Sequence, residues 1–113
     1  MTAAMRLALW SAVFALAASS LPATAAPEGP RRQELVRMVR QDCGSCHGMR
    51  LTGGLGPALT PSALADKPVQ SLAATIYHGR PGTPMPPWRA MLSAEEAEWI
   101  AQQLQAGFPA ETP

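Results

Sequence analysis

Two cysteines and a histidine stand within five residues of one another, at Cys43, Cys46 and His47, and the chain contains no other cysteine. The spacing C-x-x-C-H is typical of covalent attachment of a c-type haem. Two thiols at this spacing can each add to a vinyl group of one porphyrin, and the following histidine is then placed to coordinate the iron. The motif predicts one covalent haem c on Cys43 and Cys46, with His47 as a ligand of the iron.

Two other uses of a Cys-x-x-Cys pair fit the rest of the sequence less well. Thiol–disulfide exchange proteins of the thioredoxin kind surround the pair with a βαβ pattern, and residues 26–113 contain no strand-like run. A structural zinc site needs four Cys or His ligands, and after the motif only His78 remains. Haem attachment is therefore the preferred interpretation.

A methionine in a rigid loop is the best second ligand for the iron. Residues 79–88 contain four prolines and two glycines, so they predict an extended loop, and Met85 lies within it. The competing donors are Met38, Met49, Met91 and His78. Met38 lies on a predicted helix, and Met49 is too close to the motif to reach the far face of a haem. Met91 is interpreted as a packing residue and His78 as a surface residue.

Two further residues are expected beside the haem. The carbonyl of Pro57, in the Gly56-Pro57 pair, can accept the Nδ1–H of His47 and so fix the tautomer of a metal-bound imidazole. A plain turn at Pro57 is an equally good interpretation of the spacing. Trp88 is expected to cover the haem edge, where its indole N–H can meet a propionate.

Helical patterns precede and follow these loops. Residues 31–43 place Leu35, Val36, Val39 and Cys43 on one face, so the first helix leads directly into the motif. Ser93 and Glu96 form a capping box at the start of a last helix that runs to about residue 105 and is terminated by a glycine. Trp99 on this helix is expected to pack it against the first helix.

Two shorter helices are predicted between the loops. Thr60-Pro61 opens a helix that extends over residues 62–65, with the threonine as cap and the proline in the first turn. The next helix is expected to start at residue 66 or 67, with Pro68 in its first turn, and Gly79 ends it.

The first 25 residues have the three parts of a secretory signal peptide. Arg6 gives a positive start, residues 7–18 are apolar, and Ala23-Thr24-Ala25 supplies a cleavage site with small residues. The apolar run is short for a membrane span, which needs about 20 residues. We therefore expect two segments, a cleaved signal peptide at 1–25 and a single haem domain at 26–113, periplasmic and not stably inserted in the membrane. Attachment of haem to C-x-x-C-H outside the bacterial cytoplasm agrees with this compartment.

The charges give no indication of a nucleic-acid partner. Arg6 is the only charged residue before position 26, so residues 26–113 carry eight basic and eight acidic side chains. Their distribution is uneven, with arginines in the first half and glutamates near the end. Two solvated helix faces are the simpler interpretation, and a dipolar surface that steers docking onto a redox partner is the alternative.

The order of helix, C-x-x-C-H, Gly-Pro loop, helices, Met-Pro loop and last helix resembles the small monohaem class I cytochromes c. This resemblance implies an all-α class I cytochrome c fold, with three to five short helices around one covalently bound haem and the first and last helices crossing. It also implies haem c on Cys43 and Cys46, axial iron ligands His47 and Met85, and Pro57 as the carbonyl partner of the histidine.

A closer likeness is to the NirC-type cytochromes of the denitrification gene cluster. The segments that carry it are Val36–Gly48, Leu51–Leu59 and His78–Trp88. The likeness implies a periplasmic electron carrier that takes electrons from an upstream donor and passes them to the haem-cd nitrite reductase. The alternative role is an accessory that accepts electrons during maturation of that enzyme's special haem.

An iron with two protein ligands has no open position for a substrate, so the chain is predicted to be an electron-transfer protein and not an enzyme. A catalytic or gas-binding haem protein is the other alternative, in which Met85 is absent from the iron. Such a site usually needs a distal acid or base, and His78 is the only histidine left for that role.

Overall fold

The computed structural model describes residues 26–113, and this part of the chain contains helices and loops with no strand. The signal peptide predicted at residues 1–25 lies outside the described residues. The α-helices are α1 (Gly29–Met38), α2 (Gly44–His47), α3 (Pro61–Leu64), α4 (Val69–His78) and α5 (Ala94–Ala106), and a π-helical segment η1 (Val39–Cys43) joins the first two. The prediction of an all-α fold with several short helices is confirmed for these residues.

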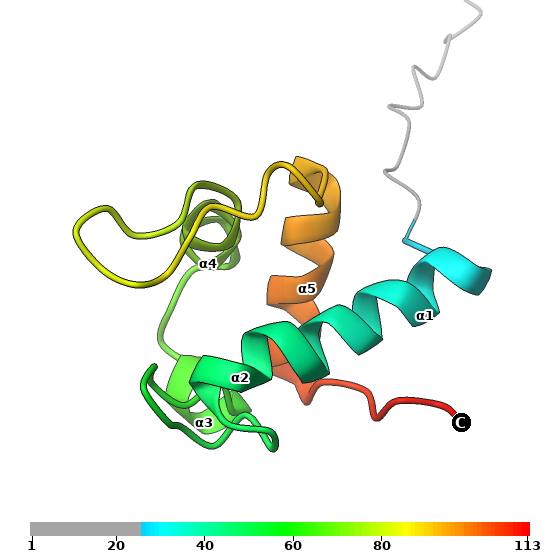
Figure 1. Cartoon of the computed structure of the whole chain (residues 1–113), viewed down its shortest axis with the longest axis horizontal. Helices are drawn as coiled ribbons and strands as arrows, with labels where there is room; N and C mark the ends of the chain where they lie inside the picture. Colours follow the sequence, from blue (N-terminus) through cyan, green and yellow to red (C-terminus); the bar gives the residue numbers. More distant parts are fainter. Residues whose placement is uncertain (1–25) are drawn as a thin grey trace, which may run out of the picture.

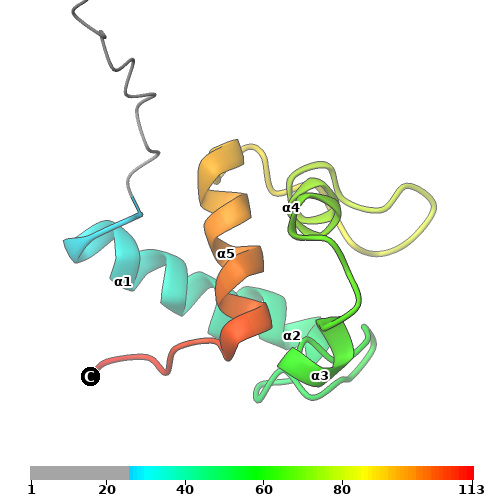
Figure 2. The ribbon, with the colours of Figure 1, turned by 180° about the vertical axis from the view of Figure 1, so that it is seen from behind.

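Helices α1 and α5 cross, and α4 packs on the other side of α5. Helix α5 passes behind the end of α1 in Figure 1 and in front of it in Figure 2. Leu35 of α1 and Val39 of η1 are fully buried, and they belong to one core cluster with Ile100 and Leu104 of α5. The predicted apolar faces of the first and last helices therefore form the centre of the protein.

The first helix does not stay α-helical up to the motif. It starts at Gly29, two residues earlier than predicted, and its hydrogen bonding changes to the π pattern over Val39–Cys43. A π segment inserts extra backbone into a helix and is often found at functional sites. Here it ends at Cys43, which lies half-buried against the core cluster.

Helix α5 begins with the predicted capping box. The Ser93 hydroxyl accepts the Glu96 N–H at 3.0 Å, and the Glu96 carboxylate accepts the Ser93 N–H at 3.2 Å. Further along the helix, Trp99 is buried and lies under the guanidinium of Arg32, at 5.6 Å from the ring centroid. The prediction that Trp99 packs the last helix against the first is confirmed.

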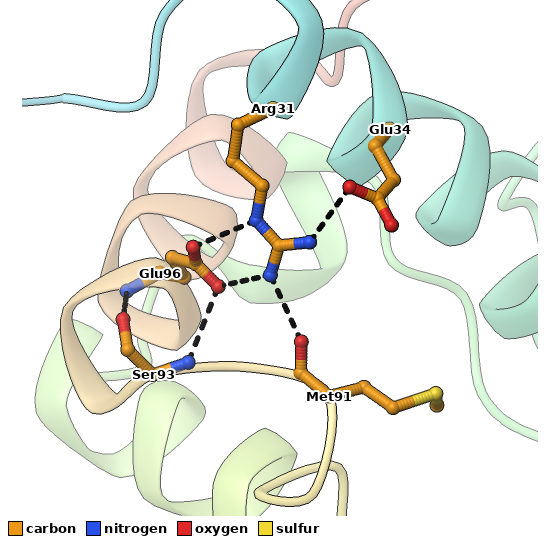
Figure 3. Close-up of polar contacts among 5 residues, drawn as sticks. All are labelled: Arg31, Glu34, Met91, Ser93 and Glu96. Atoms are coloured by element: carbon orange, nitrogen blue, oxygen red, sulfur yellow. Dashed lines mark hydrogen bonds and ion pairs between the residues drawn. The ribbon is translucent and has the colours of Figure 1, made fainter.

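Glu96 also joins the two crossing helices, as Figure 3 shows. Arg31 donates from Nε and Nη2 to the two carboxylate oxygens of Glu96, at 2.8 and 2.6 Å. Its remaining contacts are to Glu34 and to the carbonyl of Met91, both at 2.9 Å. Hydrogen bonds from Arg31 lower the pKa of the Glu96 carboxyl, and the same bonds raise the pKa of Arg31.

The C-terminal residues run back to η1 and are held there by Arg40. Its guanidinium donates to the carbonyls of Phe108 and Pro109 and lies over the Phe108 ring, 5.6 Å from the centroid. Gln41 adds a hydrogen bond to Glu111 at 3.2 Å. Several of the arginines and glutamates that the sequence separates are thus in contact with the opposite end of the chain. The interpretation of two separate solvated faces is wrong for Arg31, Arg40 and Glu96.

Helix α3 lies beside the C-terminal end of α5, and α4 packs along α5 on the side opposite to α1. Thr60 caps α3 through a hydrogen bond from the Ala63 N–H, as predicted. Helix α4 begins at Val69, not at residue 66 or 67, because the backbone of Pro68 is extended and makes it the N-cap residue. Gln105 of α5 donates to the carbonyls of Leu64 and Lys67, which ties both short elements to the last helix.

None of the helices in residues 26–113 combines the length and the apolar character that crossing a membrane requires.

Candidate haem site

The two cysteines of the motif lie on one side of a single helical turn. Cys43 closes η1 and Cys46 is in α2, and both thiols are free. Residues three apart on a helix share a face, so both sulfurs can reach one planar ligand. Their surroundings differ, because Cys43 is half-buried and Cys46 is exposed. Burial raises the pKa of the Cys43 thiol to about 11, so the free thiol stays protonated at neutral pH.

His47 ends α2, and its imidazole is held by the loop that follows. Its Nδ1 lies 2.7 Å from the Pro57 carbonyl oxygen. The Gly-Pro spacing was equally compatible with this hydrogen bond and with a plain turn, and the hydrogen bond is present. A carbonyl only accepts, so Nδ1 carries the proton and Nε2 has a free lone pair. This arrangement is the usual one for a metal-bound histidine.

Backbone hydrogen bonds fold the loop after His47 onto the motif. The N–H of Gly53 donates to the His47 carbonyl and that of Gly56 to the Cys46 carbonyl, both at 2.8 Å. Leu51 has a positive φ of 61° and is buried, so its side chain anchors the loop in the core. Sequence reasoning missed this residue, because a leucine carries no signal of a left-handed backbone.

The loop approaches the imidazole so closely that one position requires glycine. A β-carbon at Gly56 would lie 2.7 Å from both Nδ1 and Cε1 of His47. Such a distance is far inside van der Waals contact, so any side chain at this position would displace the ring or the loop.

The second loop, residues 79–88, carries Met85 and Trp88, and both side chains are half-buried. Trp88 packs against the core cluster, and its backbone N–H donates to the Ile76 carbonyl near the end of α4 at 3.2 Å. In Figure 1 this loop and the loop after His47 extend to the same side of α5, away from the start of α1 and from the C-terminus. The fold thus brings the loops that carry Pro57 and Met85 to one side of the molecule.

Helix α4 lines that side with apolar residues that the protein itself covers only in part. None of its ten residues is buried, and Leu72 and Ile76 lie half-buried at the border of the core cluster. An incompletely covered apolar face, on the side of α5 to which the loops with Pro57 and Met85 extend, fits a large apolar prosthetic group. The paired thiols and the tautomer-fixed imidazole fit one with an iron centre. The residues present therefore fit haem c.

The other sequence candidates lie in positions without such a setting. His78 is exposed at the end of α4, edge-on to the Tyr77 ring at 4.9 Å between centroids. Met49 and Met91 are exposed, and Met38 packs against the core. Within residues 26–113, no three His, Cys, Asp or Glu side chains gather as a group that could hold a metal ion, which is the arrangement that the zinc alternative needs.

Comparison with known proteins agrees with this site. Residues 30–103 match the family described as cytochrome C oxidase, cbb3-type, subunit III, and the chain belongs to that family. It is therefore a c-type cytochrome, an electron-transfer protein with covalently bound haem c.

Individual relatives narrow the class to the NirC type, as the sequence predicts. Cytochrome c55X of Pseudomonas aeruginosa is 53% identical over 102 residues, which cover 88% of this chain and 86% of that protein. The solved structure of the c-type cytochrome NirC is 58% identical with a TM-score of 0.70, over 72% of this chain and 95% of that one.

A third similarity is to one part of a larger enzyme. The structure of dihydro-heme d1 dehydrogenase NirN in complex with DHE is 32% identical with a TM-score of 0.57. The alignment covers 68% of this chain and only 16% of the dehydrogenase.

Proposed function

We propose that this chain is a periplasmic carrier of single electrons that takes electrons from an upstream donor and delivers them to the haem-cd nitrite reductase. In this proposal residues 1–25 are a signal peptide that is removed. Residues 26–113 hold one haem c through Cys43 and Cys46, with His47 and Met85 as the axial ligands. The observation that carries the proposal is the hydrogen bond of 2.7 Å between Nδ1 of His47 and the Pro57 carbonyl.

The protein's part in this chemistry is to set and protect the electronic state of the iron. Bound haem supplies a one-electron couple between ferric and ferrous iron. The Pro57 carbonyl holds the Nδ1 proton of His47, which leaves Nε2 as a donor and makes the imidazole a stronger ligand. A thioether from Met85 would raise the reduction potential relative to a second imidazole. Two protein ligands on the iron would leave no open position for a substrate, so its chemistry would be outer-sphere electron transfer.

Docking onto a partner needs an accessible surface beside the site. Leu55 is 93% exposed and Met49 is 66% exposed, and both belong to the loop that is hydrogen-bonded to the motif. Between Cys43 and Ala65 the chain contains no acidic residue, and Arg50 is exposed. This loop therefore presents an apolar and weakly basic face, which suits a partner surface with an apolar centre and acidic rim.

The first test is the absorption spectrum of the protein produced with a haem-attachment system. We expect a sharp reduced α-band and a weak near-infrared sulfur-to-iron band in the oxidised form. This band should disappear in Met85→Ala and persist in the control Met91→Ala, which removes an exposed methionine. A high-spin spectrum, or a sulfur band that survives in Met85→Ala, would contradict the ligand assignment.

Partner kinetics then test the role. Reduced protein mixed with oxidised nitrite reductase in a stopped-flow instrument should transfer its electron at a rate that rises with reductase concentration. For the compartment, cell fractionation should find the haem-stained protein in the periplasm, and deletion of residues 2–25 should abolish haem attachment.

A second role is favoured by the similarity to dihydro-heme d1 dehydrogenase. In this role the chain accepts electrons released when that enzyme oxidises its substrate during maturation of the special haem. Oxidised protein mixed with the dehydrogenase and its substrate would then be reduced, while mixing with nitrite reductase would give no transfer.

A further inference from the structure

We propose that the Thr83 hydroxyl is the positioning group that holds Met85 ready for the iron. The inference rests on the proposed function, because it takes Met85 as an axial ligand. Thr83 does not touch the haem in this account. It acts through the backbone of the residue two positions further along the chain.

The hydroxyl of Thr83 joins both halves of the loop. Its Oγ1 donates to the Arg80 carbonyl at 2.7 Å and accepts the N–H of Met85 at 3.3 Å. The Met85 carbonyl accepts the N–H of Arg80 at 3.2 Å. The backbone of Met85 is therefore held on its N–H side by Thr83 and on its carbonyl side by Arg80.

Backbone contacts close the base of the loop, at a distance from the residues that the Thr83 hydroxyl joins. Trp88 and Arg89 donate their N–H groups to the Ile76 and Tyr77 carbonyls, both at 3.2 Å. A β-carbon at Gly79 would lie 2.6 Å from the backbone between Pro86 and Pro87, so the start and the end of the loop are in contact there. These contacts fix where the loop starts and ends, but not the direction in which Met85 points.

Few other groups are available to shape the tip. The four prolines of residues 79–88 have no N–H to donate. Within the described part of the chain, Thr83 is the only residue of this loop whose side chain makes hydrogen bonds. The side chains of Arg80, Pro81 and Pro84 are exposed, so packing does not hold the tip either. Two backbone hydrogen bonds also hold the tip, from the Thr83 N–H to the Arg80 carbonyl at 3.1 Å and from the Arg80 N–H to the Met85 carbonyl. Among the side chains of the loop, the Thr83 hydroxyl is the group that adds to them and that contacts the N–H of Met85.

The test compares Thr83→Val with Thr83→Ser and with a matched control elsewhere. Valine keeps the shape of threonine and removes the hydroxyl, while serine keeps the hydroxyl. Thr75 makes the same kind of hydrogen bond, to the Ser71 carbonyl at 2.8 Å, but lies within α4, so Thr75→Val is the control. The readouts are the rate of carbon monoxide binding to the reduced protein and the sulfur-to-iron band of the oxidised protein, neither of which reports fold stability alone.

We expect Thr83→Val to bind carbon monoxide about tenfold faster than the parent protein, the factor that loss of one to two net hydrogen bonds gives. Its sulfur-to-iron band should weaken at lower temperature than in the parent. Thr83→Ser and Thr75→Val should behave like the parent. A Thr83→Val protein with the parent's carbon monoxide rate and sulfur band would overturn the inference.

A second measurement does not depend on a variant that folds. In the parent protein the Met85 N–H should exchange with deuterium more slowly than that of Gly82, which has no hydrogen-bond partner among the described residues. Equal exchange rates would also overturn the inference. A parent protein that lacks the sulfur band would instead contradict the ligation by Met85, so the two failures are distinguishable.

Discussion

Gly56 lies against the imidazole of His47, and a β-carbon at position 56 would be 2.7 Å from Nδ1 of that ring. The same loop delivers the Pro57 carbonyl to the same nitrogen. Because Gly56 has no side chain, the loop can approach the ring closely enough for the Pro57 carbonyl to hold the histidine.

Gly56→Ala should therefore disturb both the fold and His47, the proposed ligand of the iron. The added methyl group must push the ring or the loop aside, so we expect a loss of about 2 kcal/mol in the free energy of unfolding, within the range for overpacking a tight site. The reduction potential should also shift, because the Nδ1 hydrogen bond lengthens. Voltammetry and denaturant unfolding measure the two effects.

Gly44→Ala is the matched control for this change. Gly44 is helical and buried, and a β-carbon there would meet its nearest atom at 3.5 Å, an ordinary contact. Alanine also favours a helix over glycine by about 1 kcal/mol. A Gly44→Ala protein with normal potential beside an altered Gly56→Ala protein supports the steric argument, and equal effects would refute it.

The ion pair of Arg31 and Glu96 predicts a dependence of stability on pH. Arg31 lowers the pKa of Glu96 in the folded protein below that in the unfolded chain, which is near 4.3. The stabilisation is therefore complete above the unfolded pKa and is lost as the pH falls through the lower folded pKa. Thermal unfolding followed by far-UV circular dichroism between pH 7 and pH 3 measures it.

Glu96→Gln removes the charge, and at pH 7 the variant should be about 1 kcal/mol less stable, the usual scale of a partly exposed pair. The difference from the parent should shrink as the pH falls below the unfolded pKa. Glu95→Gln is the control, since Glu95 is exposed in the same helical turn and makes no ion pair among the described residues. A constant difference between parent and Glu96→Gln down to pH 3 would contradict the prediction.

Arg40 should stabilise the end of the first helical segment through the C-terminal residues. Arg40→Gln loses the hydrogen bonds to the Phe108 and Pro109 carbonyls and the contact with the Phe108 ring. We expect a loss of about 1–2 kcal/mol in the free energy of unfolding. Arg37 is exposed one helical turn earlier and serves as the control, and equal losses for Arg37→Gln and Arg40→Gln would show that only helix charge matters.

Leu55 should govern encounter with the electron acceptor without changing the iron. Its side chain is 93% exposed, so Leu55→Lys should leave the spectrum and the reduction potential unchanged. We expect electron transfer to nitrite reductase to slow by about tenfold, because about 1–2 kcal/mol of apolar burial is lost at the interface. Met91→Lys, at an exposed methionine before α5, is the control, and equal slowing in both variants would exclude the loop as the docking face.

Local patterns predicted much of this protein. The Ser93–Glu96 capping box, the Thr60 cap and the apolar face with Leu35 and Val39 all rest on neighbours within four residues, and each is present in the fold. The start of α4 was misplaced, because sequence alone cannot distinguish proline as the cap from proline in the first turn.

Contacts between distant residues were not predictable in the same way. Arg31 and Glu96 are 65 positions apart, and nothing in the spacing of either residue indicates the other. The π segment that ends at Cys43 was not predictable either, because its five residues carry no pattern that distinguishes them from an α-helix. Thr83 had a local signal, a hydroxyl residue two positions before the loop methionine, but its partner Arg80 becomes visible only when the loop is closed.

The loop after His47 has a consequence for how such a protein can diverge. Its closure onto the motif uses backbone groups of Gly53 and Gly56, while the side chain of Leu55 is 93% exposed and makes none of these hydrogen bonds. Mutation can therefore exchange this outward side chain without moving the histidine. On the proposed docking face, substitution at such a position would change the redox partner, while the hydrogen bond that holds His47 is inherited intact.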